Sequence, residues 1–255
     1  MRNRMLNNDL KFREFALNKF KNKITFQKKS YLGFDKYIYT NKEAEYVIPF
    51  RLKSAKNQNM PLFIYCPGSA SNGHGNLFNL IEFFAKMSFT GLFRKDCSII
   101  VPQAFRNTET DEKKIIDFCI SLADLKNEII KQTAANKKKV YIIGTSQGGF
   151  VVWYSLLLFP DDYTAATAVE GAFIGERGNS IDDIKNVAKT PLWVAHSSND
   201  KCVSIDSDDK SVKMLKNAGA DVLYTRMNKY GHKMSTVFYK TKPFINWMLE
   251  KEKTE

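Results

Sequence analysis

The hydrophobic residues of this chain fall into short apolar runs that alternate with longer amphipathic segments. Short apolar runs are typical of buried strands, and they predict strands at 61–66, 97–102, 139–144, 163–170, 191–196 and 221–226. Between them, stretches such as 112–132 and 211–219 repeat apolar residues every three or four positions, which indicates helices. Alternating strands and helices predict an α/β fold with a mostly parallel sheet that is covered by helices on both faces.

The first part of the chain follows a different pattern. Two apolar segments, 37–40 and 46–52, flank the polar turn NKEAE and predict a pair of antiparallel strands. Before them, an apolar residue recurs every four positions, which predicts an amphipathic helix with a stripe of Phe12, Ala16, Phe20 and Ile24. We therefore divide the chain into an N-terminal extension, 1–30, that is expected to be helical, and one domain over 31–255.

The net charge of +12 is concentrated in that extension. Nine Lys or Arg against two acidic residues give residues 1–30 a charge of +7. Because the excess is local, it does not indicate a nucleic-acid partner. Two interpretations remain: a helix docked on its own domain with a solvated basic face, or a weak contact with an anionic membrane surface.

The sequence favours a cytoplasmic protein without a metal or cofactor. No window approaches the ~18 apolar residues of a membrane span, and the start of the chain lacks the apolar run of a secretory signal. The cysteines form no CxxC pair and no His/Cys cluster, so we expect no metal site and four reduced thiols: Cys66, Cys97, Cys119 and Cys202.

Candidate chemistry centres on the stretch VYIIGTSQGGF, which contains a G-x-S-x-G motif around Ser146. The motif alone is weak, but here it follows an apolar strand and precedes an apolar helix. That context is typical of a strained turn that exposes a serine hydroxyl for nucleophilic attack. Ser146 is therefore the expected nucleophile.

A serine nucleophile needs a general base, and a carboxylate must orient that base. Of the three histidines, only His232 follows every candidate acid, so it is the expected base. Asp200 lies in the loop after the strand 191–196 and is the expected acid. Three further acids are nearby, namely Asp206, Asp208 and Asp209. They are expected to lie at the start of a helix instead.

Acyl transfer also needs donors for the developing oxyanion. We expect one to be the backbone N–H of Gln147, and the other to be that of Ser69 or else Ala70, in the loop after strand 61–66. Glu170 ends another strand at the same edge, where it either contacts a polar or cationic substrate group or is a solvated or internally paired carboxylate, which we favour.

These pieces resemble the α/β-hydrolase superfamily, and within it the branch of polyhydroxybutyrate depolymerases and feruloyl esterases. The matching stretches are PLFIYCPGSASNGHGN, VYIIGTSQGGF, PLWVAHSSNDKCVS and KYGH with FINWML. The resemblance implies a serine ester hydrolase with the triad Ser146, Asp200 and His232 and with no cofactor. Pro67-Gly68 and His196-Ser197 depart from the His-Gly pairs usual at those places, which leaves the substrate class open.

The expected function is thus hydrolysis of a small carboxylic ester through an acyl-enzyme. A thioesterase or a small serine peptidase would use the same residues, and a catalytically silent binding protein could share the fold. The sequence does not determine the oligomeric state.

Overall fold

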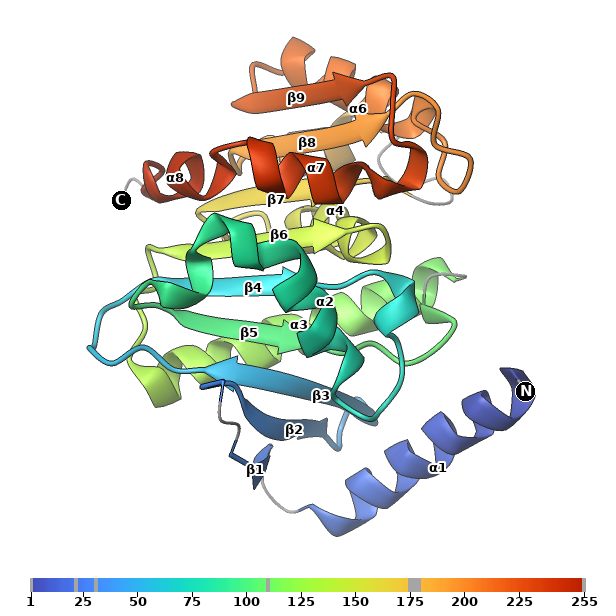
Figure 1. The fold of residues 1–255 in the computed structure, drawn as a ribbon, viewed down its shortest axis with the longest axis vertical. Coiled ribbons are helices and arrows are strands. Elements are labelled where there is room, and N and C mark those ends of the chain that lie inside the picture. Colours follow the sequence, from blue (N-terminus) through green and yellow to red (C-terminus); the bar gives the residue numbers. More distant parts are fainter. Residues whose placement is uncertain (1, 21–22, 30–31, 109–110, 174–179, 254–255) are drawn as a thin grey trace.

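The computed structural model describes residues 2–20, 23–29, 32–108, 111–173 and 180–253, and it confirms the α/β architecture (Figure 1). A nine-stranded sheet has the order β1-β2-β3-β5-β4-β6-β7-β8-β9. The strands are β1 (Ile24–Lys28), β2 (Asp35–Asn41), β3 (Tyr46–Lys53), β4 (Leu62–Cys66), β5 (Ser98–Pro102), β6 (Val140–Thr145), β7 (Ala165–Val169), β8 (Leu192–Ser197) and β9 (Val222–Met227).

The sheet combines two kinds of pairing. From β5 to β9 all neighbouring strands are parallel, whereas β1, β2 and β3 pair antiparallel with one another and β3 pairs antiparallel with β5. The carboxyl ends of the parallel strands therefore lie along one edge, where the loops that carry chemistry are expected to meet.

Helices cover both faces of the sheet because successive strand residues point to opposite sides. In β4, Leu62 and Ile64 face a core formed with α3, α4, α5 and α6, while Phe63 and Tyr65 face a core formed with α2, α7 and α8. The helices are α2 (Phe78–Met87), α3 (Glu112–Thr133), α4 (Gln147–Leu158), α5 (Ile181–Val187), α6 (Asp206–Asn217), α7 (Met234–Thr241) and α8 (Phe244–Leu249), with short 3-10 turns η1 (Ser69–Ser71), η2 (Ser88–Thr90), η3 (Leu92–Arg94) and η5 (Gly231–Lys233).

The N-terminal helix, α1 (Arg2–Lys19), lies beside β2 and β3 and is shorter than the sequence pattern suggests (Figure 1). Phe12, Ala16 and Phe20 pack against Ile38 and Val47. The apolar stripe of the helix therefore contacts the protein's own domain. Ile24 was expected in the same stripe, but it begins β1, because its backbone pairs with β2. Over the described residues, no helix combines the length and apolar character needed to cross a bilayer.

Candidate active site

Ser146 occupies the sharp turn between β6 and α4, with φ +54° and ψ −118°. Two neighbouring glycines make this turn possible. A Cβ on Gly144 would lie 1.9 Å from the carbonyl oxygen of Gly148, and a Cβ on Gly148 would lie 1.8 Å from that of Cys66. The glycines of the motif are therefore required by direct backbone contact, and the serine is held in a conformation that L-residues rarely adopt.

The structure brings the three expected triad side chains together at the carboxyl edge of the sheet. His232 in η5 places Nε2 2.9 Å from the Ser146 hydroxyl, and its Nδ1 lies 2.7 Å from Oδ2 of Asp200. The carboxylate fixes the tautomer, because Nδ1–H donates to it and leaves Nε2 to accept the serine proton. The Asp200 side chain has no exposed surface, whereas that of His232 is 26% exposed.

Asp200 is stabilised as a carboxylate by the loop that carries it. Its Oδ1 accepts the backbone N–H groups of Cys202 and Val203, at 2.8 and 3.1 Å. Burial raises the pKa of Asp200, but the hydrogen bonds from His232 and from these N–H groups outweigh it and hold the pKa below its usual value. The acid therefore stays ionised at neutral pH.

Among the alternative acids, the expected helix start is present, but one member turns inward. Asp206 accepts the Ser204 hydroxyl, and Asp209 binds Tyr224 and Arg226 near the surface. Asp208 is fully buried. Its Oδ2 accepts Nδ1–H of His196 at 2.7 Å.

The buried His196 links Asp208 to the expected triad. Its Nε2 lies 3.2 Å from the Val203 carbonyl oxygen and 3.3 Å from Oδ2 of Asp200. Burial lowers the pKa of His196, yet the hydrogen bond to Asp208 and the charges of Asp208 and Asp200 raise it overall. Burial also raises the pKa of Asp208 to about 6, against the pull of His196. A second acid–histidine pair, Asp208 and His196, therefore lies next to Asp200.

Sequence reasoning missed Asp208 as an inward residue, although a signal was present. Counting back from the buried Val212 and Leu215 by four and seven positions reaches Asp208, so all three share one helix face. Helical periodicity would have separated it from the surface acids Asp206 and Asp209.

The loop expected to supply the second oxyanion donor lies directly against Ser146, the expected nucleophile. A Cβ on Gly68 would lie 3.5 Å from the Cβ of Ser146. Glu82 of α2 holds this loop by accepting the N–H of Gly68 and the hydroxyl of Ser71, at 2.9 and 2.5 Å. Ser69 begins η1 just as Gln147 begins α4, and N–H groups at helix starts have no partner within the helix.

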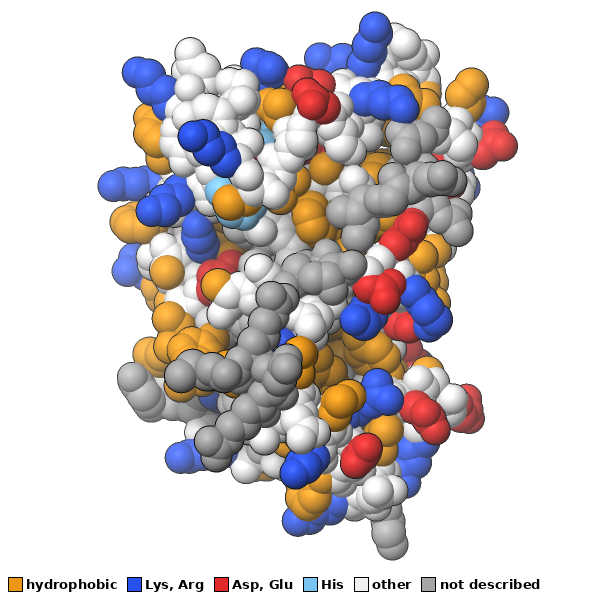
Figure 2. Space-filling view, turned by 90° about the vertical axis from the view of Figure 1, so that its right-hand side faces the viewer, with side chains coloured by type: hydrophobic (Ala, Val, Ile, Leu, Met, Phe, Trp, Pro, Cys, Tyr) orange, Lys and Arg blue, Asp and Glu red, His pale blue; other side chains and the backbone are white. Residues whose placement is uncertain are grey.

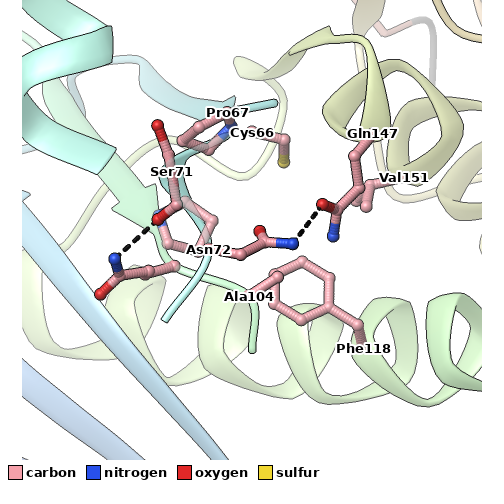
Figure 3. A pocket seen from close by; sticks show the side chains of 10 residues that line it. Cys66, Pro67, Ser71, Asn72, Ala104, Phe118, Gln147 and Val151 are labelled. Atoms are coloured by element: carbon pink, nitrogen blue, oxygen red, sulfur yellow. Dashed lines mark hydrogen bonds between the residues drawn. The ribbon is translucent and has the colours of Figure 1, made fainter. Parts of the chain in front are cut away.

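A side-chain contact joins this loop to the residue after the nucleophile. Nδ2 of Asn72 donates to Oε1 of Gln147 at 2.6 Å, across a cavity of only about 10 Å³ (Figure 3). Both side chains are buried. The contact therefore fixes the loop and the elbow relative to one another.

Glu170 is an internally paired residue. It is 1% exposed and has a positive φ of +56° at the end of β7. Its Oε1 accepts the N–H of Ser235 at 2.8 Å, in the first turn of α7. Because η5 leads directly into α7, Glu170 supports the segment that carries His232.

One group of described side chains has the composition of a metal site: Asp200, Cys202 and His232, whose ligand atoms lie within 4.8 Å of one another. Asp200 and His232 are already hydrogen-bonded together. A cation there would replace that hydrogen bond, so we assign the group to the triad geometry.

Comparisons with known proteins agree with this architecture. A family model described as phospholipase/carboxylesterase matches residues 100–249. The carboxylesterase SOBER1 of Arabidopsis thaliana is 27% identical over 127 residues, which are 49% of this chain and 54% of that protein. A probable SOBER1-like carboxylesterase of the same plant is 27% identical over 100 residues, 39% of this chain and 38% of that protein. The chain thus spans about half the length, or less, of these curated relatives.

Solved structures show the same fold at low sequence identity. A thermostable esterase superposes with a TM-score of 0.74 at 21% identity, over 87% of this chain and 64% of that one. The crystal structure of SOBER1 superposes with a TM-score of 0.60 at 18% identity, over 75% of this chain and 100% of that one. The superfamily resemblance is confirmed, while the narrower depolymerase and feruloyl-esterase branch stays a prediction. Because the family model spans more than half of the chain, the protein belongs to the phospholipase/carboxylesterase family.

Proposed function

We propose that this protein is a serine carboxyl-ester hydrolase that acts on small esters through the triad Ser146, His232 and Asp200. The observation that carries the proposal is the unbroken row of hydrogen bonds from Asp200 through His232 to the serine hydroxyl. The row ends at a strained turn on the carboxyl edge of the sheet, where ligands bind in folds of this kind.

In the proposed reaction, Ser146 Oγ attacks the ester carbonyl carbon while Nε2 of His232 takes the hydroxyl proton. Asp200 stabilises the resulting imidazolium through Nδ1–H. The N–H groups of Gln147 and of Ser69, or alternatively Ala70, hold the oxyanion. The imidazolium then gives its proton to the leaving alcohol as the C–O bond breaks, which leaves an acyl-enzyme.

Water completes the cycle by the same route. His232 accepts a proton from the water that attacks the acyl-enzyme, and it returns that proton to Ser146 Oγ as the carboxylic acid leaves. No cofactor or metal enters this scheme. Thioesters and peptides would pass through the same steps, so substrate preference depends on the surrounding pocket.

The test compares wild type with Ser146→Ala, using p-nitrophenyl acetate and a fluorophosphonate probe. Wild type should hydrolyse the ester and become labelled, because only an activated serine reacts with the probe. The alanine variant should do neither and should keep its melting temperature. Retention of more than a few per cent of turnover would disprove the nucleophile, and an unlabelled wild type would favour a silent binding protein.

We further propose a cytoplasmic location with reduced cysteines. Cys66, Cys97 and Cys119 are buried free thiols. Burial raises the pKa of Cys119 to about 12 and that of Cys97 to about 11, which keeps both protonated and unreactive. A weak contact of the basic helix with anionic membranes stays part of the proposal, and sedimentation with anionic vesicles tests it.

A further inference from the structure

A hollow of about 310 Å³ lies beside the loop proposed to hold the oxyanion. Ser69 and Ala70 of that loop form one side, and Met5 of α1 and Phe78 of α2 contribute large apolar side chains. Polar side chains complete the lining: Asn72, Arg106 and Asn107. Gly68, the preceding residue, lies against Ser146. The hollow therefore begins next to the place where an ester carbonyl would bind.

The N-terminal helix is fastened at this place by a buried carboxylate. Asp9 is 4% exposed, and its Oδ1 accepts from Nδ1 of His74 at 2.6 Å and from Nη1 of Arg106 at 2.7 Å. Its Oδ2 accepts the N–H of Arg106 at 3.2 Å. The ring of Phe12 stacks on His74 with centroids 4.9 Å apart. Helix α1 is thus joined to the loop after β4 and to the loop after β5.

The residues that line the hollow indicate which kind of chemical group it could bind. Met5 and Phe78 are 42% and 56% exposed, so both present apolar surface to a ligand in the hollow. On this face of the molecule hydrophobic side chains are exposed in several separate places among polar ones, with Lys and Arg mostly towards the margin (Figure 2). The volume falls at the lower end of the range for small-molecule sites.

We propose that α1 forms one wall of the substrate site, and that the hollow between Met5, Ala70 and Phe78 receives a short alkyl or aryl group of the ester. Asp9 is then a positioning residue that holds this wall against the oxyanion loop. The inference rests on the proposed function and adds a substrate class to it: esters that carry a compact apolar group.

The test measures kcat/KM for Met5→Ala and Phe78→Ala on two substrate series. One series varies the acyl group, from p-nitrophenyl acetate to p-nitrophenyl butyrate, and the other varies the alcohol, from methyl acetate to phenyl acetate. Losing one wall should lower kcat/KM about tenfold for the larger member of one series, mainly through KM, and less than twofold for the smaller member. The series that responds identifies the group that the hollow binds.

Phe15→Ala is the matched control, because Phe15 is an apolar residue of α1 that is 50% exposed and does not line the hollow. It should leave both series unchanged. The inference would be overturned if the ratio of kcat/KM between the larger and the smaller ester were the same for wild type, Met5→Ala and Phe78→Ala in both series. The proposed function would remain intact in that case.

A binding measurement keeps the inference testable without turnover. In a Ser146→Ala background, calorimetry with butyramide and acetanilide, which are the amide analogues of the larger acyl and the larger alcohol group, should show at least fivefold weaker binding of one of them when Met5 or Phe78 is replaced. Unchanged affinity for both amides would overturn the inference. Failure of the proposed function would appear separately, as ester hydrolysis that survives Ser146→Ala.

Discussion

Two regions of this protein are built around the same pair of groups, a buried aspartate bonded to a histidine. At the carboxyl edge, Asp200 holds His232 at 2.7 Å, and at the N-terminal helix, Asp9 holds His74 at 2.6 Å. The two pairs differ in what the remainder of the imidazole ring contacts. His232 offers its second nitrogen to a serine hydroxyl, whereas His74 is stacked on Phe12.

The comparison teaches that an acid–histidine pair is not in itself a catalytic feature. Asp9 also accepts from Arg106, so its charge is used to join a helix to two loops. Asp200 accepts two backbone N–H groups of its own loop and leaves its histidine directed at the hydroxyl of Ser146, the proposed nucleophile. What the histidine faces decides whether the pair supports chemistry or architecture.

The largest expected effect follows from Asp200→Asn. The amide keeps the shape but favours the wrong imidazole tautomer, so kcat should fall about ten-thousandfold, by analogy with other triads. Steady-state kinetics on p-nitrophenyl acetate measure it. Asp9→Asn serves as the contrast and should keep kcat within threefold on the same substrate. Equal losses in the two variants would erase the proposed distinction between the regions.

A smaller effect is expected at Asp208, which is linked to Asp200 through His196. Asp208→Asn removes the charge that orients His196, whose Nε2 lies 3.3 Å from Asp200. We expect kcat to fall about tenfold with KM unchanged, as for outer partners of other functional histidines. Asp208→Glu should restore part of kcat. An unchanged kcat in Asp208→Asn would show that the second pair serves stability alone.

The same variant should change how stability depends on pH. The pKa values of His196 and Asp208 are both raised in the folded protein, to about 6 for Asp208. A raised pKa contributes stability below the unfolded value, about 3.9 for Asp, that is lost as the pH rises through the folded value. Urea unfolding at pH 4.5 and 7.5 should therefore show the advantage of wild type over Asp208→Asn shrinking at the higher pH. A growing advantage would contradict this.

At the N-terminal helix the expected effect is on binding and stability. Asp9→Asn leaves His74 and Arg106 without their charged partner, which should cost about 1–3 kcal/mol of unfolding free energy. It should also raise KM about threefold for the larger esters of the responsive series. Glu14→Gln, an exposed acid on the same helix, is the control and should change neither quantity. If Asp9→Asn had the same KM as wild type for the larger esters, α1 would have no role in substrate binding.

The smallest effect is expected at Asp206. It begins α6 and accepts the Ser204 hydroxyl at 2.9 Å on the surface. Asp206→Asn should leave kcat unchanged and cost at most about 1 kcal/mol. A severe loss of kcat here, beside a mild one at Asp200, would move the proposed triad acid to Asp206.

The sequence predicted the parallel half of the sheet and the arrangement of Ser146, Asp200 and His232 because each follows the end of an apolar strand. Order along the chain then corresponds to position along one edge. The cluster around Asp9 has no such rule. Asp9 contacts residues 65 and 97 positions away, and a lone acid in a basic helix gives no sign of its partners.

The N-terminal helix itself was predicted too long for a related reason. Ile24 continues the spacing of the apolar stripe, but pairing with β2 satisfies its backbone and begins a strand instead. Local periodicity cannot register that competition, since the partner strand lies in a separate part of the sequence.

The glycine contacts of the elbow bear on how such a protein can diversify. Because a Cβ on Gly148 would fall 1.8 Å from the Cys66 carbonyl oxygen, main chain meets main chain between α4 and the end of β4. The spacing of the proposed nucleophile and oxyanion loop therefore depends on this backbone contact and on the hydrogen bonds of Asn72 and Glu82, and not on the apolar side chains that line the hollow. Met5 and Phe78 can vary without disturbing that spacing, so libraries at these two positions should yield new substrate preferences while the proposed triad stays unchanged.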